Sequence, residues 1–167
     1  MTDFIVNRVA NSTLVTIDLE DFYDDTPRIF VDFSQWLEDG LILREQSFRA
    51  QLNQHNWTAY KGAHVAIGCS TDVIIPAWAS MLVATYIAPI AQTLVQGSLK
   101  ALDSAIFQNI IENMDASAFE GKPVIIKGCS KKPVPPAAYV ALVCKLQPIV
   151  KSLMFGEACS TVPLFKN

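Results

Sequence analysis

The chain has 167 residues, of which 51% are hydrophobic and 17% are charged. A chain of this length fits one domain and can bury roughly 70% of the surface that it exposes when unfolded. An average soluble domain has about 25% charged residues. The composition therefore indicates a large apolar core and an apolar surface that a homo-oligomer would cover. The net charge of −3 argues against a nucleic-acid-binding protein, which needs a basic surface.

The N-terminus lacks the basic stretch and long apolar run of a secretory signal. We therefore expect a cytoplasmic protein whose four cysteines are free thiols or ligands rather than disulfides. Residues 1–60 hold all four Arg and ten acidic residues, whereas residues 61–167 hold all nine Lys and six acidic residues. This distribution predicts Arg–carboxylate pairs. We expect a single domain over residues 1–167, with an acidic segment (1–60) packed on a duplicated α/β core (61–158).

The expected elements alternate along the chain. A short helix is expected near residues 3–10, strands at 14–19 and 28–33, and an amphipathic helix at 43–54. Residues 73–99 carry no charge, which is long enough for a membrane span. Pro76 and Pro89 interrupt this stretch, so it predicts a buried helix (76–87) and a buried strand (91–96) and no membrane association.

A long helix over residues 99–113 and a last strand over 152–157 complete the pattern. Strands that alternate with helices across residues 64–157 indicate βαβ crossovers. The sequence therefore predicts an α/β fold with a mainly parallel or mixed sheet and flanking helices.

An internal duplication is indicated by two segments, about residues 50–100 and 108–158. Each contains an aromatic residue, a glycine two positions later, a short apolar strand and then Gly-Cys-Ser, at residues 68–70 and 128–130. Each continues with a Pro-Ala step, a helix-sized segment, a Pro-Ile step, a strand and a glycine. We expect two pseudo-symmetric halves of one sheet.

Three cysteines follow predicted strands. Cys69 and Cys129 come directly after a strand and before a loop that leads to a helix, and Cys159 follows the last expected strand. Because ligands bind at the carboxyl ends of parallel strands, we expect these thiols to form a metal or thiol site. Thiolates suit zinc or an iron–sulfur cluster. The neighbouring hydroxyl groups, Lys side chains and backbone N–H groups would form anion-binding loops that favour a thiolate; these residues are Ser70, Thr71, Ser130, Lys131, Ser160 and Thr161.

The alternative is that these cysteines only pack. Free Cys often fills a small apolar space, and the chain contains no Cys-x-x-Cys pair, which is the stronger signature of a metal site. Cys144 falls inside a predicted helix and is expected in the core. No catalytic acid or base can be identified, so the sequence does not settle whether the protein is an enzyme. Two functions stay open: an accessory protein that binds a metal, a cluster or a persulfide in iron–sulfur or sulfur metabolism, and a non-catalytic, homodimeric interaction module.

Several stretches of the chain resemble a family of Bacteroidetes proteins catalogued as a domain of unknown function (domain of unknown function 2480). They are residues 5–12, 16–21, 40–45, 124–130 and 151–163, the last of which reads Lys-Ser-Leu-Met-Phe-Gly-Glu-Ala-Cys-Ser-Thr-Val-Pro. The resemblance covers essentially the whole chain and implies no catalytic residue. It does imply an association with iron–sulfur assembly proteins as partners.

Overall fold

The computed structural model describes residues 13–128 and 131–167, and the chain forms two compact units. Unit 1 comprises residues 1–23 and 107–167, and unit 2 comprises residues 24–106. The helix expected near residues 3–10 lies outside the described residues, as do Cys129 and Ser130. The structure defines the fold of each unit separately. The expected single domain over residues 1–167 therefore stays a prediction.

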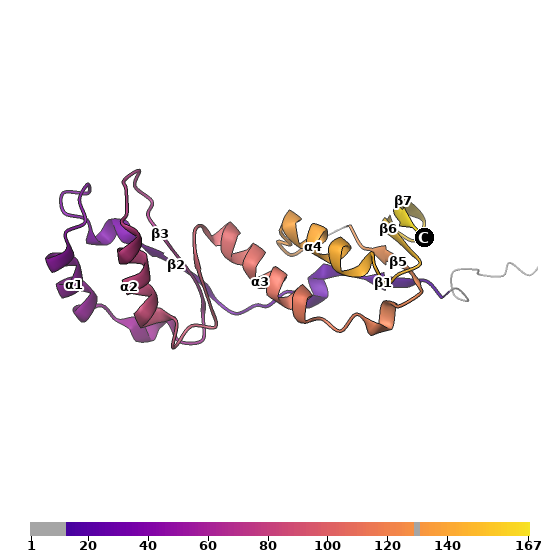
Figure 1. Cartoon of the computed structure of the whole chain (residues 1–167), viewed down its shortest axis with the longest axis horizontal. Helices are drawn as coiled ribbons and strands as arrows, with labels where there is room; N and C mark the ends of the chain where they lie inside the picture. The colour runs from indigo at the N-terminus through magenta and orange to yellow at the C-terminus, as the bar shows by residue number, and fades with distance from the viewer. Residues whose placement is uncertain (1–12, 129–130) are drawn as a thin grey trace, which may run out of the picture. The chain divides into compact units, whose positions relative to one another are not determined.

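Unit 2 is built on a parallel sheet of three strands in the order β2-β3-β4, of which β2 and β3 are labelled in Figure 1. The strands are β2 (Arg28–Asp32), β3 (His64–Gly68) and β4 (Thr93–Gln96). The first four residues of β3 are all buried, as expected for a central strand that is covered on both faces. The chain connects β3 to β4 through α2 (Ala77–Ile87), which is the crossover that parallel strands require.

One face of this sheet packs on α1 (Glu45–Gln54), on α2 and on two 3-10 helices, η2 (Phe33–Trp36) and η3 (Trp57–Tyr60). Aromatic rings fill this core. Phe48 is completely buried, and its ring lies 6.1 Å from Phe33, 5.5 Å from Trp36 and 5.9 Å from Trp78. Offset and edge-to-face contacts of this kind add to the stabilisation that apolar burial provides.

Unit 1 contains a separate mixed sheet in the order β1-β5-β6-β7. The strands β1 (Val15–Ile17), β5 (Pro123–Ile126) and β6 (Ser152–Glu157) are parallel, and β7 (Ser160–Lys166) is antiparallel to β6. The core of this unit includes Leu142 and Leu146 of α4 (Pro136–Leu146) and Phe107 and Ile111 of α3 (Leu99–Asn113). Two further 3-10 helices, η1 (Leu19–Phe22) and η4 (Ser117–Phe119), belong to unit 1.

The α/β fold with mostly parallel strands is confirmed, but the expectation of one continuous sheet is wrong. Each segment of the predicted duplication completes a sheet of its own, because β2 pairs with β3 whereas β1 pairs with β5. Residues 152–157 were expected to be the last strand, and β7 follows them as a further strand. Among the described residues, no helix is long and apolar enough to cross a membrane.

The two units repeat several backbone hydrogen bonds. The N–H of Gly62 donates to the carbonyl of Ile90, and the N–H of Gly121 donates to that of Ile149, both at 2.8 Å. An Asp carboxylate also caps the 3-10 helix after the first strand of each unit, Asp18 in unit 1 and Asp32 in unit 2. These features are consistent with a duplication, whose common origin stays a prediction.

Candidate functional site

A cavity of about 630 Å³ lies at the carboxyl ends of the unit 2 strands. Its walls come from β2, from the residues that follow β3 and β4, and from the first turn of α3; they are Phe30, Gly68, Cys69, Gly97, Ser98, Leu99 and Lys100. Ligands of open parallel sheets bind at this edge. The cavity is lined mainly by apolar atoms, with a thiol, a hydroxyl and an ammonium group as its polar side-chain groups. This composition is typical of small-molecule sites.

Two glycines that line this cavity have little room for a side chain. A Cβ atom on Gly68 would lie 3.0 Å from the Phe30 ring and 3.2 Å from the carbonyl oxygen of Gly97. Gly97 itself has a φ of +142°, which side-chain-bearing residues rarely adopt. The chain can therefore turn from β4 into α3 beside Cys69 without filling the space with side chains.

The start of α3 supplies the polar side of the cavity. Ser98 precedes the helix, and its hydroxyl oxygen accepts a hydrogen bond of 3.3 Å from the N–H of Ala101, as helix-capping residues do. α3 has 15 residues, so the partial positive charge at its N-terminus adds to that of the Lys100 ammonium group. The cavity is therefore suited to an anionic group, and Cys69 is half-buried at its wall.

The loop after Cys69 is tied to β2 by one carboxylate. Asp32 accepts hydrogen bonds from the N–H of Ser70 at 3.0 Å and from the N–H of Ser34 at 2.9 Å. Burial raises the pKa of Asp32, but the hydrogen bonds from Ser70 and Ser34 outweigh it and lower this pKa to about 2. The charged Asp32 side chain thus fixes where the backbone turns after Cys69.

The other predicted thiols belong to unit 1. Cys159 is exposed in the turn between β6 and β7, and Cys129 lies outside the described residues. Cys144, which was expected in the core, is exposed, so that prediction is wrong. Among the described residues, no group of three or more His, Cys, Asp or Glu side chains could hold a metal ion. Convergence of the three thiols Cys69, Cys129 and Cys159 stays a prediction.

In unit 1, Lys131 of the predicted anion-binding loop contacts the Glu20 carboxylate, and anion binding by this loop stays a prediction. The backbone N–H groups of Lys131 and Lys132 both donate to Glu20 Oε1, the second at 2.9 Å. In the β6–β7 hairpin, Ser160 is exposed, and the Thr161 hydroxyl lies 3.9 Å from Met154 Sδ. Among these loop residues, Ser70 is the one that directly follows a thiol lining a cavity.

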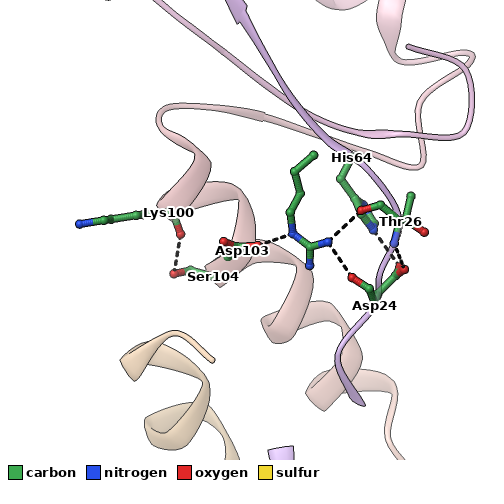
Figure 2. Close-up of polar contacts among 7 residues, drawn as sticks. Asp24, Thr26, His64, Lys100, Asp103 and Ser104 are labelled. Carbon is green, nitrogen blue, oxygen red and sulfur yellow. Dashed lines mark hydrogen bonds and ion pairs between the residues drawn. The ribbon is translucent and has the colours of Figure 1, made fainter. Parts of the chain in front are cut away.

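A second polar cluster lies at the opposite, amino ends of the unit 2 strands (Figure 2). Arg28 Nε donates to Asp103 Oδ1 at 2.6 Å, and Arg28 Nη1 donates to the carbonyl oxygens of Asp24 and Thr26 at 2.6 and 2.8 Å. His64 is 2% exposed, and its Nε2 lies 2.8 Å from Asp24 Oδ2. The cluster joins the start of β2 to the start of β3 and to α3.

The geometry of this cluster defines the tautomer of His64. Because Nε2 faces a carboxylate, it carries the proton, and in the neutral ring Nδ1 is the acceptor. Nδ1 is buried and has no hydrogen-bond partner among the described residues. His64 does not line the cavity at the carboxyl ends of the strands. We therefore assign the cluster a structural role.

The cluster predicts a pH dependence of stability. Hydrogen bonds from Thr26 are the main effect that lowers the pKa of Asp24 to about 2 from its usual 3.8; His64 lowers it further, and burial opposes them. Because the folded-state pKa is depressed, the contribution of Asp24 is present above pH 4 and is lost as the pH falls toward 2. At 1.36 kcal/mol per pKa unit it amounts to about 2 kcal/mol.

We expect Asp24→Asn to be less stable than the wild type at pH 6 by about this amount, and the two to converge near pH 2. Urea unfolding at a series of pH values, followed by tryptophan fluorescence, measures the difference. Asp72→Asn, in an exposed loop of the same unit, is the matched control and should differ little from the wild type. A gap between wild type and Asp24→Asn that stays constant down to pH 2 would contradict the prediction.

Sequence reasoning missed most of the cavity lining. It identified Cys69, but it did not single out Phe30, Ser98 or Lys100. The sequence did contain one signal for these residues. Gly97-Ser98, a glycine followed by a helix-capping residue, lies between a strand and a long helix. Gly68-Cys69-Ser70 likewise has a glycine at the end of a strand.

Together, the parallel strands, the cavity at their carboxyl ends and the helix that begins beside it define an α/β protein with the geometry of a small-ligand site. The chain belongs to the family described as Protein of unknown function (DUF2480), whose model matches residues 3–167. A search of curated proteins found no match, and a search of solved structures found none either.

Proposed function

We propose that the protein is an accessory protein of sulfur metabolism that binds a small anionic ligand in the unit 2 cavity and carries sulfur on Cys69. The observation that carries the proposal is the position of the Cys69 thiol in the wall of a 630 Å³ cavity, together with the start of α3 and Lys100. In the proposed step, the Cys69 thiolate attacks the outer sulfur of a donor persulfide. The new S–S bond forms on Cys69, and the donor leaves as a thiolate.

The chemistry of the cavity supports a persulfide carrier more than a metal centre in this unit. A metal ion or cluster needs several thiolate, imidazole or carboxylate ligands, and no described group of three includes Cys69. A persulfide needs one accessible thiol and surroundings that stabilise an anionic sulfur. Lys100 and the first residues of α3 line the same cavity as Cys69.

The proposal has further parts. Iron–sulfur assembly proteins are the proposed partners, because they consume sulfur delivered as persulfide. We also propose a cytoplasmic location and a homodimer. In this reading residues 1–167 work as one domain, and unit 1 contributes Cys129 and Cys159 as further thiols for the same chemistry.

The experiment compares alkylation of Cys69 by iodoacetate, which is anionic, and by iodoacetamide, which is neutral. We expect iodoacetate to be favoured at Cys69, and Lys100→Glu to lower the iodoacetate rate about tenfold, as charge reversal beside a cleft does, with little effect on iodoacetamide. Cys144, exposed on α4, is the internal control and should show no such preference. Mass spectrometry of the peptides gives both rates.

A second measurement tests the sulfur chemistry itself. After incubation with a small-molecule persulfide and removal of the excess, the Cys69 peptide should carry one additional sulfur atom, and Cys69→Ser should lack it. Equal loading of Cys69 and Cys144, or equal iodoacetate rates in the wild type and Lys100→Glu, would overturn the proposal.

A further inference from the structure

We infer that α2 and β4 of unit 2 form a surface through which two copies of the chain associate. β4 is an edge strand, and within the described part of the chain it pairs with β3 alone. Edge strands in soluble proteins are usually protected by charged residues, by proline or by a bulge. β4 has four residues, reads Thr-Leu-Val-Gln and contains no charge, proline or bulge. Its outer backbone groups can therefore pair with another strand.

Two other sheet edges, β2 and β7, show such protection, whereas β1, the remaining edge of unit 1, is an uncharged strand of three residues. β2, the opposite edge of the same sheet, begins with Arg28 and ends with Asp32. In unit 1, the edge strand β7 contains Pro163 and Lys166, and its register with β6 is interrupted. β4 is thus the unprotected edge of the unit 2 sheet.

The helix beside this edge is also uncharged on its outer side. The exposed residues of α2 are Ala77, Met81 and Thr85, and Met81 is 63% exposed. Met81 lines two hollows. One lies against α1 and includes Trp78, Leu82 and the charged residues Glu45 and Arg49; the other runs toward the sheet edge and includes Ser80, Ala84, Leu94 and Val95.

These features fit a second copy because they are self-complementary. A two-fold interface brings the same patch together from both subunits, so each subunit must supply both a projection and a hollow. Met81 is a flexible projection, and the hollow beside Ser80 and Ala84, about 230 Å³ in volume, is large enough to receive a methionine side chain. Neither α2 nor β4 carries a charge that would repel its symmetry mate.

Antiparallel pairing of β4 with β4 of the second copy is compatible with the same two-fold axis. It joins the two three-stranded sheets into one sheet and removes both unprotected edges. The two α2 helices then lie on the same face of that sheet, where Met81 of each copy can enter the hollow of the other. This association is independent of the chemistry proposed for Cys69.

Sedimentation velocity of the full chain over a concentration series tests the inference. We expect a dimer for the wild type and at least about a tenfold weaker association for Met81→Lys, since each subunit would bury an unpaired charge. Val140→Lys is the matched control, because Val140 is 64% exposed on α4 of unit 1; it should leave the association unchanged.

Hydrogen exchange of the β4 amides separates edge pairing from helix contact alone. In the wild type these amides should become more protected as the protein concentration rises, and in Met81→Lys they should not. A monomeric wild type would overturn the inference. So would a dimer that Val140→Lys disrupts and Met81→Lys does not, or one in which protection of β4 is independent of concentration.

Discussion

Replacing Arg28 by alanine is expected to lower the free energy of unfolding of unit 2 by about 3 kcal/mol. The Arg28 side chain is 14% exposed and that of its partner Asp103 is 21% exposed. Breaking a buried ion pair from one side costs about 3–5 kcal/mol, because the remaining charge stays without its partner, and we place this partly buried pair at the lower end of that range. The carbonyl oxygens of Asp24 and Thr26 lose a charged donor as well.

Tryptophan fluorescence makes this loss measurable in one unit. The three Trp residues of the chain, Trp36, Trp57 and Trp78, all lie in unit 2. Urea unfolding followed at these indoles therefore reports the unit that Arg28 stabilises. We expect the urea concentration at the midpoint of unfolding to fall, while the slope of the unfolding free energy against urea concentration stays the same.

The matched control is Arg49→Ala. Arg49 also forms an ion pair through Nε, with Glu45 at 2.9 Å, but the two side chains are 54% and 61% exposed. Exposed i,i+4 pairs contribute about 0.3–0.5 kcal/mol, so this variant should be nearly as stable as the wild type. Equal effects of Arg28→Ala and Arg49→Ala would show that the cluster at the amino ends of the strands contributes no special stability.

Local sequence patterns predicted most of the elements. The helix expected at residues 99–113 and the strand expected at 152–157 match α3 and β6, and the uncharged stretch of residues 73–99 resolves into α2 and β4. Proline positions decided this last case, because Pro89 ends a helix that apolar composition alone would have continued. Ion pairing within the acidic segment is confirmed for Arg44 and Arg49, whereas Arg28 pairs with Asp103, outside residues 1–60.

The pairing of strands could not be predicted in the same way. β1 and β2 are near neighbours in the chain, yet β1 pairs with β5 and β2 with β3. The alternation of apolar and polar residues indicates which face of a strand is buried, but it does not indicate which strand is its neighbour in the sheet. β7 was missed because Pro163 argues against a central strand, whereas an edge strand tolerates it.

Only part of the candidate site could be predicted from the sequence, for a related reason. Cys69 stood out because Gly-Cys-Ser occurs twice in the chain. Phe30 and Lys100 line the cavity through tertiary structure: Phe30 projects from β2, and Lys100 belongs to a helix that starts after β4. No motif joins residues this far apart in sequence.

Replacing Gly156 by alanine is expected to destabilise the sheet of unit 1 by about 3 kcal/mol. Gly156 has a φ of +125°, and an added Cβ would lie 2.5 Å from the carbonyl oxygen of Ser160. An unfavourable backbone conformation costs on the order of 1–3 kcal/mol, and the clash adds to it, because the contact is with backbone that is held in the β6–β7 pairing. Hydrogen exchange of β5 and β6 amides measures the loss in this unit.

Gly121→Ala separates backbone conformation from steric exclusion. Gly121 also has a positive φ, +67°, but no heavy atom lies within 4 Å of an added Cβ. Its replacement should cost about 1 kcal/mol, which is the left-handed penalty alone. If both variants lost the same stability, the contact with Ser160 would contribute nothing to the destabilisation of Gly156→Ala. If Gly156→Ala loses more, as we expect, the close approach of β6 and β7 is what fixes the hairpin, and with it the turn that presents Cys159.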